Sequence, residues 1–513
     1  HYALGAVADW MHRVVAGPRA ATTTTSAPAT GAPIAALPLS RPDDVRLAVE
    51  SARAAQRAWA IRPLALRAHT FLRFHDLVLS EQSDLLDLIQ IENGKARAHA
   101  FEEVGDVAIV ARHYARRASS YLRPKRHLGA FPLLSQSTEL RHPVGVVGII
   151  SPWNYPLTLA ISDAIPALLA GNAVVLKPDT QAALTALRAL ELLTRAGVPE
   201  GVVQVVLGDG PVVGAAIVDH VDHLCFTGST ATGRVVAQQA AARLIGASLE
   251  LGGKNALYVA DDADLERAAE GAVRACFSSS GQLCVSAERM YLHEEIADAF
   301  LDLFLARVRA MRLGPALDYS VDMGSLTTER QLEVVVRHVE DARSRGARVL
   351  AGGRARPDLG PLFYEPTVLE GVTPLMDCYE QETFGPVVSV YRVRSDDEAV
   401  ERANEGEYGL NASVWSRDTT RGRRIAARIK AGTVNINEGY AAAWGSVGAL
   451  MGGMRASGLG RRHGAEGILG FTESQNVTVQ RLVGFGPAFG LGSQQWADVL
   501  TASLRAMKRL GVR

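Results

Sequence analysis

The stretch HLCFTGSTATG, residues 223–233, carries the strongest local signal in the chain. Its first five residues are an apolar run of strand length; glycines follow, and a helical stretch begins at Thr232. A strand, a glycine turn and a helix N-terminus together place backbone N–H groups where a pyrophosphate can bind. The spacing of Gly228, Ser229 and Gly233 differs from GxGxxG. An ordinary strand-to-helix turn therefore explains the local pattern equally well.

Similar alternation extends outward from this stretch. Helices between strands imply parallel pairing, so we expect two doubly wound α/β lobes with a seam near Glu250. Three helices should come first, over residues 46–60, 64–90 and 101–122. Strands are expected in the first lobe at 144–150, 173–177, 202–206 and 223–227, with helices at 182–196 and 232–244. In the second lobe they are expected near Met290, Val349, Val387, Ser413 and Val434, with helices at 265–277 and 328–345.

Composition excludes several classes of protein. The 513 residues include 54 basic and 54 acidic side chains, so no net basic charge favours binding to nucleic acid or to a membrane. Four cysteines are too few to staple this chain, and there is no uninterrupted run of 18 apolar residues. Residues 1–10 make a poor signal peptide, so we expect a cytoplasmic protein. His and Cys residues do not stand at zinc-ligand spacing, so we expect no metal.

Three polar residues stand where chemistry is possible. Cys284 lies in a small polar stretch after an apolar helix, where partial exposure would favour the nucleophilic thiolate, although a single cysteine is more often inert core. Glu250 lies between leucines, which predicts a carboxyl with a raised pKa, suited to act as a general base; a plain salt bridge is the commoner role. Asn154 follows an apolar strand and could donate to an oxyanion or simply form a turn.

Together, and in this order, several segments resemble the NAD(P)-dependent aldehyde dehydrogenase superfamily over residues 34–480. The matching segments are PWNYP (152–156), GNAVVLKP (171–178), FTGST (226–230), LELGGK (249–254), GQLC (281–284), ETFGP (382–386) and GTVN (432–435). Within that superfamily the chain looks most like bacterial succinate-semialdehyde dehydrogenases, including the stretch 447–464.

The resemblance implies a role for each of the three polar residues. Cys284 attacks the aldehyde carbon, and Asn154 with the Cys284 backbone N–H holds the oxyanion. After hydride transfer to the nicotinamide, water activated by Glu250 hydrolyses the thioester. A coenzyme A-acylating enzyme would not need that glutamate. A non-catalytic relative would be expected to lack at least one of the three.

The resemblance also implies a cofactor site. Lys177 would contact the adenosine ribose, and Glu382 with Phe384 the nicotinamide ribose. Many NAD-preferring relatives carry Glu three positions after the lysine, but Thr180 stands here, and no carboxylate repels a 2′-phosphate. NADP is therefore the preferred cofactor, with NAD as the alternative. The remaining residues expected at this site are Trp153, Gly228, Ser229, Gly233 and Leu251.

Some departures from the family affect the substrate. Two positions where succinate-semialdehyde enzymes often carry a carboxylate-binding Arg are Ser162 and Ser278. A lysine found in many relatives is Asp163, which removes one proposed proton-relay group. Ser286 stands in place of a second loop cysteine, so no disulfide switch is expected. Succinate semialdehyde remains the first choice of substrate, and an uncharged aromatic or aliphatic aldehyde is the alternative.

The resemblance divides the chain into an aldehyde dehydrogenase-like set of domains. Residues 34–122, 144–249 and 436–471 would bind the cofactor, and 250–435 would form the catalytic domain. Segments 123–143 and 472–482 would form an oligomerisation hairpin, which predicts a homodimer or homotetramer. Residues 1–33 are expected to be a loose lead-in. The tail, 483–513, has helical periodicity and is expected to dock on protein rather than on a membrane.

Overall fold

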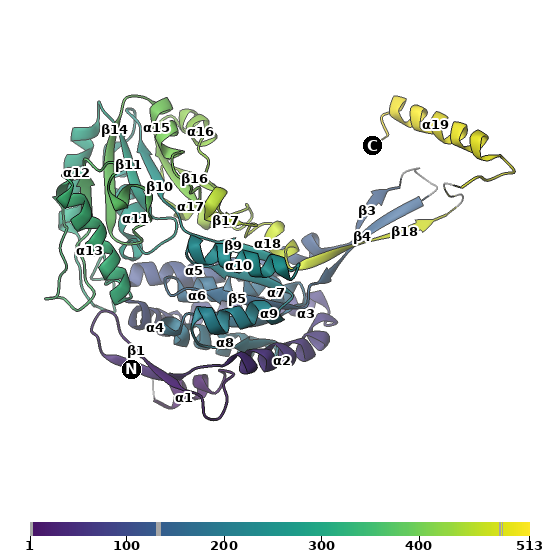
Figure 1. The fold of residues 1–513 in the computed structure, drawn as a ribbon, viewed down its shortest axis with the longest axis horizontal. Coiled ribbons are helices and arrows are strands. Elements are labelled where there is room, and N and C mark those ends of the chain that lie inside the picture. Colours follow the sequence, from purple (N-terminus) through teal and green to yellow (C-terminus); the bar gives the residue numbers. More distant parts are fainter. Residues whose placement is uncertain (1–3, 130–134, 482–483, 485, 513) are drawn as a thin grey trace.

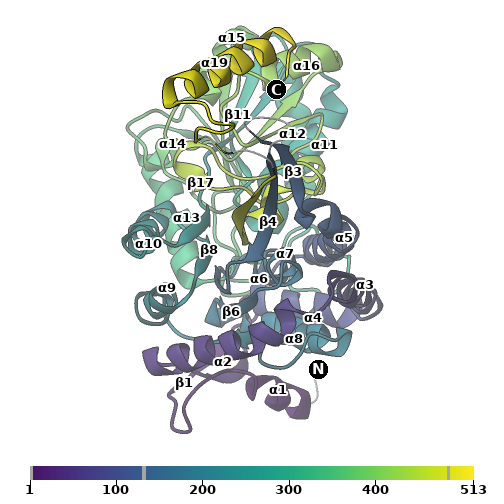
Figure 2. The same ribbon diagram turned by 90° about the vertical axis from the view of Figure 1, so that its right-hand side faces the viewer.

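The chain folds into two α/β lobes from which a narrow arm projects (Figure 1). This computed structural model describes residues 4–129, 135–481, 484 and 486–512. Figure 2 shows the lobes one above the other, with the N-terminal helices at the base. No helix within these described ranges is long and apolar enough to cross a membrane.

The first lobe is built on a six-stranded sheet of order β17-β9-β8-β5-β6-β7. Every residue of β5 and β6 is buried, as expected for central strands covered on both faces. The predicted strands of this lobe are present, but a short antiparallel strand, β17, extends the edge beside β9. The strand bounds are β5 (Val146–Ser151), β6 (Ala173–Pro178), β7 (Val203–Val205), β8 (His223–Thr227), β9 (Gly246–Glu250) and β17 (Gly458–Leu459).

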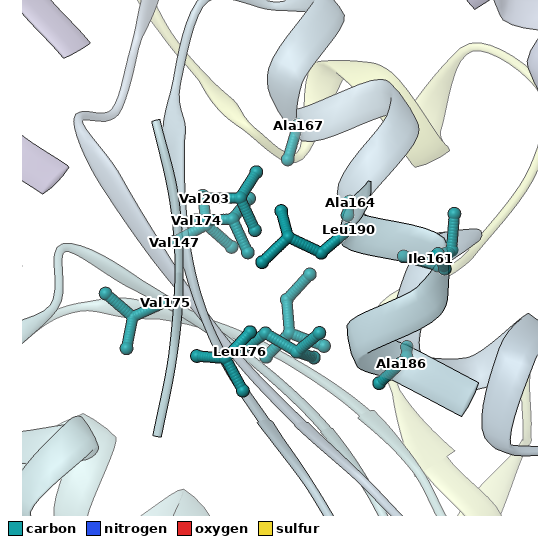
Figure 3. Close-up of a cluster of buried hydrophobic side chains, with 14 of the residues drawn as sticks. Val147, Ile161, Ala164, Ala167, Val174, Val175, Leu176, Ala186, Leu190 and Val203 are labelled. Carbon is teal, nitrogen blue, oxygen red and sulfur yellow. The ribbon is translucent and has the colours of Figure 1, made fainter. Parts of the chain in front are cut away.

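Apolar side chains of β5, β6 and β7 pack against the helices that connect them. Figure 3 shows Val147 and Val174 of the sheet facing Ile161, Ala164 and Leu190 of the helical layer. Small alanines on that layer let helix and sheet approach closely. The helices of this sheet are α6 (Pro156–Ile161), α7 (Ala164–Leu169), α8 (Ala183–Ala196), α9 (Ala215–His220), α10 (Thr230–Ala242) and α18 (Glu466–Leu469), with short turns η1 (Thr180–Ala182) and η2 (Gly210–Gly214).

The helices that precede this sheet differ from the prediction in one respect. The single helix expected over 64–90 is two helices, because the backbone leaves helical geometry at Glu81, at φ −109° and ψ 22°. Glu81 accepts hydrogen bonds from Arg188 and Arg195 of α8, which fixes this break. The bounds are α2 (Pro42–Ala60), α3 (Leu64–Ser80), α4 (Gln82–Asn93) and α5 (Arg97–Leu122).

The second lobe contains a seven-stranded sheet of order β12-β13-β14-β11-β10-β15-β16. It is parallel except at one edge, where β12 runs antiparallel to β13. The expected fold of two doubly wound α/β lobes is confirmed. The strands are β10 (Asn255–Val259), β11 (Ala287–His293), β12 (Arg348–Ala351), β13 (Thr367–Glu370), β14 (Val387–Val393), β15 (Asn411–Trp415) and β16 (Thr433–Ile436). The helices are α11 (Leu265–Phe277), α12 (Ala297–Ala310), α13 (Glu329–Ser344), α14 (Asp377–Glu380), α15 (Asp396–Ala403), α16 (Thr419–Ala426) and α17 (Ala441–Trp444).

The prediction of a loose N-terminal segment is wrong for the described residues. Helix α1 (Leu4–Met11) places Trp10 in the core of the first lobe, and Val14 is buried there too. Threonines of β1 (Thr22–Ser26) pair antiparallel with β2 (Pro33–Pro38). β-Branched threonine suits a strand, and the partner strand lies almost entirely beyond residue 33, where the predicted loose segment ends.

The arm is a three-stranded antiparallel sheet of order β18-β4-β3, followed by a separate helix (Figure 1). Its strands are β3 (Lys125–Leu128), β4 (Ser135–Pro143) and β18 (Thr472–Gln480), so segments from opposite ends of the chain pair as the resemblance implied. The predicted tail helix is α19 (Ser493–Arg509). Residues 130–134 and 482 of the predicted hairpin, and 483, 485 and 513 of the predicted tail, lie outside the described residues.

Candidate active site

The three candidate catalytic residues come together at the seam between the lobes. Asn154 follows β5, Glu250 ends β9, and Cys284 precedes β11. The Asn154 side-chain amide donates to the Gln282 carbonyl at 3.0 Å, which joins the first lobe to the cysteine loop. The charge of Glu250 acts on the Cys284 thiol. Residues from three distant segments therefore share one site. Asn154 and Glu250 lie at the carboxyl ends of their strands, where open α/β sheets bind ligands, and Cys284 reaches them from the loop before β11.

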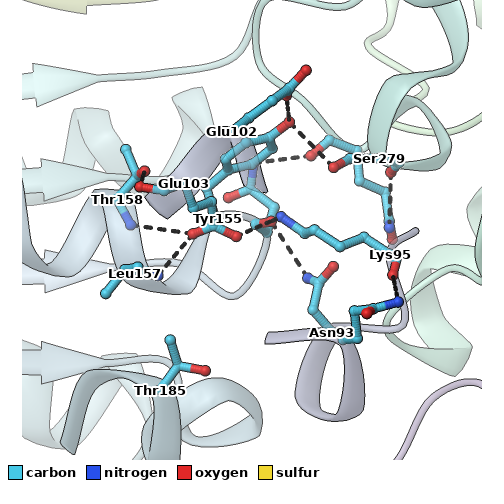
Figure 4. Close-up of polar contacts among 12 residues, drawn as sticks. Asn93, Lys95, Glu102, Glu103, Tyr155, Leu157, Thr158, Thr185 and Ser279 are labelled. Carbon is cyan, nitrogen blue, oxygen red and sulfur yellow. Dashed lines mark hydrogen bonds and ion pairs between the residues drawn. The ribbon is translucent and has the colours of Figure 1, made fainter. Parts of the chain in front are cut away.

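A buried polar network fixes the backbone at Asn154 (Figure 4). Lys95, completely buried, donates at 2.7 Å to both the Asn154 carbonyl and the Glu103 carboxylate. Glu103 in turn accepts from the backbone N–H groups of Leu157 and Thr158, which begin helix α6. Sequence reasoning missed this network, because no local pattern around Lys95 indicates that its partner lies 59 residues away.

The loop that carries Cys284 has an unusual backbone. Ser279, Ser280 and Gly281 have φ values of 50°, 56° and 70°, in the left-handed region. A Cβ on Gly281 would lie 2.0 Å from the Gly385 carbonyl oxygen, so only glycine fits there. The Asn255 side-chain amide donates to the Cys284 carbonyl at 2.7 Å and anchors the end of the loop. Such a conformation persists only where the surroundings enforce it.

The predicted partial exposure of Cys284 is confirmed, but it does not favour the thiolate. The side chain is only partly exposed, and burial with the charges of Glu250 and Glu382 raises the pKa of the thiol to about 12. In this structure the residue is therefore a thiol at neutral pH, and it needs a base to become a nucleophile. Cys225 and Cys276 are buried in the hydrophobic cores of the two lobes.

Glu250 has the raised pKa that its flanking leucines predict. Burial raises the pKa of this carboxyl to about 7, while Arg462 lowers it. The carboxylate lies against Gly452, where an added Cβ would be 3.0 Å from Oε1. A carboxyl with a pKa near neutrality can exchange protons efficiently as a general base.

The predicted phosphate-binding turn forms, with one change of role. The Ser229 hydroxyl caps α10 by accepting from the Thr232 N–H. A Cβ on Gly233 would lie 2.3 Å from Leu251, so glycine lets the helix start pack on the neighbouring strand end. The Gly228 N–H, however, donates to the Glu250 carbonyl at 3.1 Å. Gly228 thus forms part of the turn, and its N–H is not free to donate to a pyrophosphate.

The remaining candidate cofactor residues form two groups. Lys177 is buried at the end of β6, which lowers the pKa of its amine, and Thr180 begins the turn η1 beside it. On the other side of the seam, Phe384 packs edge-to-face with Trp153, with ring centroids 5.7 Å apart. No feature of the sequence indicated that this aromatic pair joins the two lobes.

Glu382 faces the glycines that follow Glu250. The Gly253 N–H donates to its carboxylate at 2.8 Å, and a Cβ on Gly252 would lie 2.4 Å from the same group. Burial raises the pKa of this carboxyl to about 8. The neighbouring backbone N–H groups of Thr383 and Phe384 donate to Glu288, which holds the loop in place.

The residues that depart from the family pattern are buried or form hydrogen bonds within the fold. Ser162 donates to Asp106 at 2.6 Å, and Ser278 is buried. Asp163 accepts two hydrogen bonds from Arg462, at 2.8 and 2.6 Å. This ion pair, 299 residues apart in the chain, was not predicted.

An apolar cluster surrounds the Cys284 thiol. It is rich in aromatic side chains, and two of its tyrosines, Tyr155 and Tyr440, donate to Glu102. Its buried members are Tyr155, Leu159, Leu283, Val285, Leu410, Tyr440 and Met451, with Trp444 packed against them. The described residues hold no group of three His, Cys, Asp or Glu side chains that could bind a metal ion.

Comparison with known proteins shows the family of the chain. The model of the aldehyde dehydrogenase family matches residues 15–477. The chain belongs to the aldehyde dehydrogenase family. A protein of Mycolicibacterium smegmatis named "Putative succinate-semialdehyde dehydrogenase [NADP(+)]" is 53% identical over 481 residues, which are 94% of this chain and 93% of that protein. Betaine aldehyde dehydrogenase 1 of rice is 37% identical over 88% of this chain and 90% of its own.

Solved structures of the family have the same fold. PnpE from Pseudomonas sp. WBC-3, in complex with nicotinamide adenine dinucleotide, superposes with a TM-score of 0.87 at 35% identity, covering 91% of this chain and 96% of its own. An aldehyde dehydrogenase from Brucella melitensis biovar abortus superposes with a TM-score of 0.85 at 32% identity, covering 90% and 94%. The aldehyde dehydrogenase fold is thus shown over most of the chain.

Proposed function

We propose that this aldehyde dehydrogenase oxidises its substrate through a thioester on Cys284 and hydrolyses that thioester with water activated by Glu250. The observation that supports this most strongly is the meeting of Cys284, Glu250 and Asn154 at one seam. The charge of Glu250 raises the pKa of the Cys284 thiol, and Asn154 contacts the cysteine loop directly. A hydrolytic enzyme needs a base beside the thioester, whereas a coenzyme A-acylating enzyme does not.

The chain's own residues account for the acid–base steps. Because Cys284 is held as a thiol, its proton must pass to water before the sulfur attacks the aldehyde carbon, so Glu250 stays free for the later step. The C–S bond forms as the carbonyl becomes an oxyanion, to which the Asn154 amide can donate in place of the Gln282 carbonyl. In the later step Glu250 takes a proton from water and the hydroxide adds to the thioester. The C–S bond then breaks, a carboxylic acid is released, and the departing Cys284 thiolate takes the proton back from Glu250.

We assign the cofactor as NADP, with NAD as the alternative. The close packing of Gly233 on Leu251 and the capped start of α10 suit a dinucleotide, with Lys177 and Thr180 on one side and Glu382 with Phe384 on the other. When bound, the nicotinamide accepts the hydride from the carbon attached to Cys284. Thr180 places no carboxylate against a 2′-phosphate, and the relative in Mycolicibacterium is named for NADP.

Two substitutions test the two chemical steps separately. Cys284→Ala should abolish turnover. Glu250→Gln should give one equivalent of reduced cofactor and then stall with an acyl group on Cys284, visible by intact-mass spectrometry. Glu270→Gln, an exposed change on α11, is the matched control and should leave the rate unchanged. A folded Cys284→Ala variant with normal turnover, or a Glu250→Gln variant with an unchanged steady-state rate, would overturn the assignment.

Succinate semialdehyde is the substrate that we propose, in accord with the name of the relative that is 53% identical. One observation favours the alternative of an uncharged aldehyde. Cys284 packs against a buried apolar cluster that includes Tyr155 and Tyr440, and the carboxylates Glu102 and Asp106 are half-buried and buried. Ser162, at a position where an arginine is often found, already donates to Asp106.

Initial rates decide between these substrates. Succinate semialdehyde should give at least a tenfold higher kcat/KM than an uncharged aldehyde of equal length, about 1.4 kcal/mol in transition-state binding. The assay compares butanal, benzaldehyde and succinate semialdehyde, each with NADP and with NAD. A higher kcat/KM for the uncharged aldehydes would retain the mechanism and replace the substrate.

We further propose a cytoplasmic homo-oligomer assembled through the arm. Its four cysteines are free, which fits a reducing compartment. The three-stranded arm projects from the body, and Val477 and Val479 of β18 are 42% and 55% exposed on it. An exposed strand edge with apolar side chains favours pairing with a second copy.

A further inference from the structure

A buried ion pair lies beside the candidate base without belonging to the family-derived set of catalytic residues. Arg462 donates through Nε and a terminal nitrogen to the two carboxylate oxygens of Asp163. The two side chains are only 11% and 14% exposed. Two parallel hydrogen bonds fix the guanidinium in both position and orientation. The cation at this place is therefore rigid.

The backbone brings this cation to Glu250. Arg462 pairs with Met451 through two backbone hydrogen bonds, at 2.9 and 2.7 Å. Gly452, the next residue, lies against the Glu250 carboxylate. The strand β17 of the same segment pairs with β9, with Gly458 opposite Glu250. The segment 451–462 thus carries both the Arg462 guanidinium and the backbone at Gly452 that packs against the Glu250 carboxylate.

Charged and titratable groups reach Glu250 from every element packed around it. They are Arg461 and Arg462 from the 451–462 segment, Asp163 from the start of α7, Cys284 from the cysteine loop and Cys225 from β8. Burial raises the pKa of Glu250 most, and Arg462 opposes burial more than Asp163 assists it. In the described part of the chain, the Glu250 carboxylate itself accepts no hydrogen bond. Its charged form depends on these longer-range interactions.

We propose that Arg462, held by Asp163, is a positioning residue of thioester hydrolysis: it supplies the fixed cation that keeps Glu250 ionised while water is activated. This inference rests on the proposed role of Glu250. An arginine does not release its proton in the working pH range, so the pair acts by charge and not by passing protons. The anion at position 163, which removes the family's lysine, thus anchors a replacement cation from another part of the chain.

The experiment uses the full-length enzyme and follows the pH dependence of the steady-state rate after the first turnover. A double variant, Asp163→Asn with Arg462→Gln, removes both charges and keeps a hydrogen-bonding pair. Its acid limb should move to higher pH, with a rate about tenfold lower than wild type at pH 6 and nearly equal at pH 9. The burst of reduced cofactor at pH 9 should remain, because hydride transfer precedes the step affected.

Two single variants separate charge from structure. Asp163→Asn retains the cation and removes the anion, so its acid limb should move to lower pH, opposite to the double variant. Arg462→Lys keeps the charge and should keep the limb near wild type. Circular dichroism and NADP binding establish that each variant is folded. If the double variant does not fold, the direction of the Asp163→Asn shift still decides.

The proposal fails if the folded double variant has the wild-type limb, or if Asp163→Asn shifts it upward or leaves it unchanged. These outcomes are distinct from failure of the proposed function. Glu250→Gln should stall as an acyl-enzyme whatever the pair does. An active Glu250→Gln variant would remove the base itself, whereas a stalled one with an unresponsive pair removes only the role of Arg462.

Discussion

Burial drives the two reactive side chains toward their neutral forms. It raises the pKa of Cys284 to about 12 and that of Glu250 to about 7, and the charge of Glu250 further opposes ionisation of the Cys284 thiol. Cys284 is therefore a thiol at neutral pH, whereas the Glu250 carboxyl gains or loses a proton near neutrality. The surroundings of each side chain, and not its residue type alone, set its pKa.

The pH dependence of hydrolysis follows from the Glu250 carboxyl. Its proton-accepting form is the charged one, so protonation below a pKa of about 7 removes the base. We expect the steady-state rate to fall about tenfold for each pH unit below that limb and to level off above it. The check is a kcat profile from pH 5.5 to 9 with saturating cofactor. A flat profile between pH 5.5 and 8 would contradict a Glu250-limited step.

At the scale of elements, the active site depends on joints between segments. Lys95, just after α4, holds both Glu103 of α5 and the turn that carries Asn154. The turn between β5 and α6 is thus held by Lys95, in the connection after α4, and by Glu103 of α5, both of which lie far earlier in the chain (Figure 4). The Lys95 ammonium also lies 3.6 Å from the ring centroid of Tyr155. Removal of this cation affects stability and chemistry together.

Lys95→Met tests that joint. It leaves the Glu103 carboxylate buried without its cation, which should cost about 3–5 kcal/mol of unfolding free energy. The turn at Asn154 should loosen, so kcat should fall more than cofactor affinity does. Denaturant unfolding and initial rates measure the two effects. Lys125→Met, on the exposed strand β3, is the control and should change neither. A Lys95→Met variant as stable as this control would refute the clamp.

At the scale of the whole molecule, the arm and the tail extend beyond the two packed lobes (Figure 1). Strand β18 is almost wholly exposed along its length, and α19 buries Trp496 but exposes Val499 and Leu504. Isolated three-stranded sheets need an apolar covering to be stable. A second copy of the chain would provide that covering.

Val479→Asp on β18 tests the assembly. A charge in the centre of an apolar interface is costly, so we expect the molar mass in solution to fall to half that of wild type or less. Multi-angle light scattering after gel filtration gives the mass. Ile61→Asp, 84% exposed on the first lobe, is the control and should leave the mass unchanged. An unaltered oligomer for Val479→Asp would remove the arm from the interface.

The sequence by itself determined the α/β alternation and the family. Strands such as 223–227 can be predicted from the sequence because burial on both faces requires a continuous apolar run. The glycine turn that follows reflects local backbone geometry. The motifs around Asn154, Glu250 and Cys284 also lie within short windows. Such features depend on neighbours along the chain, so they can be predicted without a structure.

Only the tertiary structure decided the partners and the protonation states. The Asp163–Arg462 pair, the hold of Lys95 on Asn154 and the threonine strand β1 all depend on residues that are distant in sequence. The same holds for Cys284, whose pKa rises because the fold buries it beside carboxylates from other segments. Desolvation and charge proximity are properties of three-dimensional surroundings, which no local pattern contains.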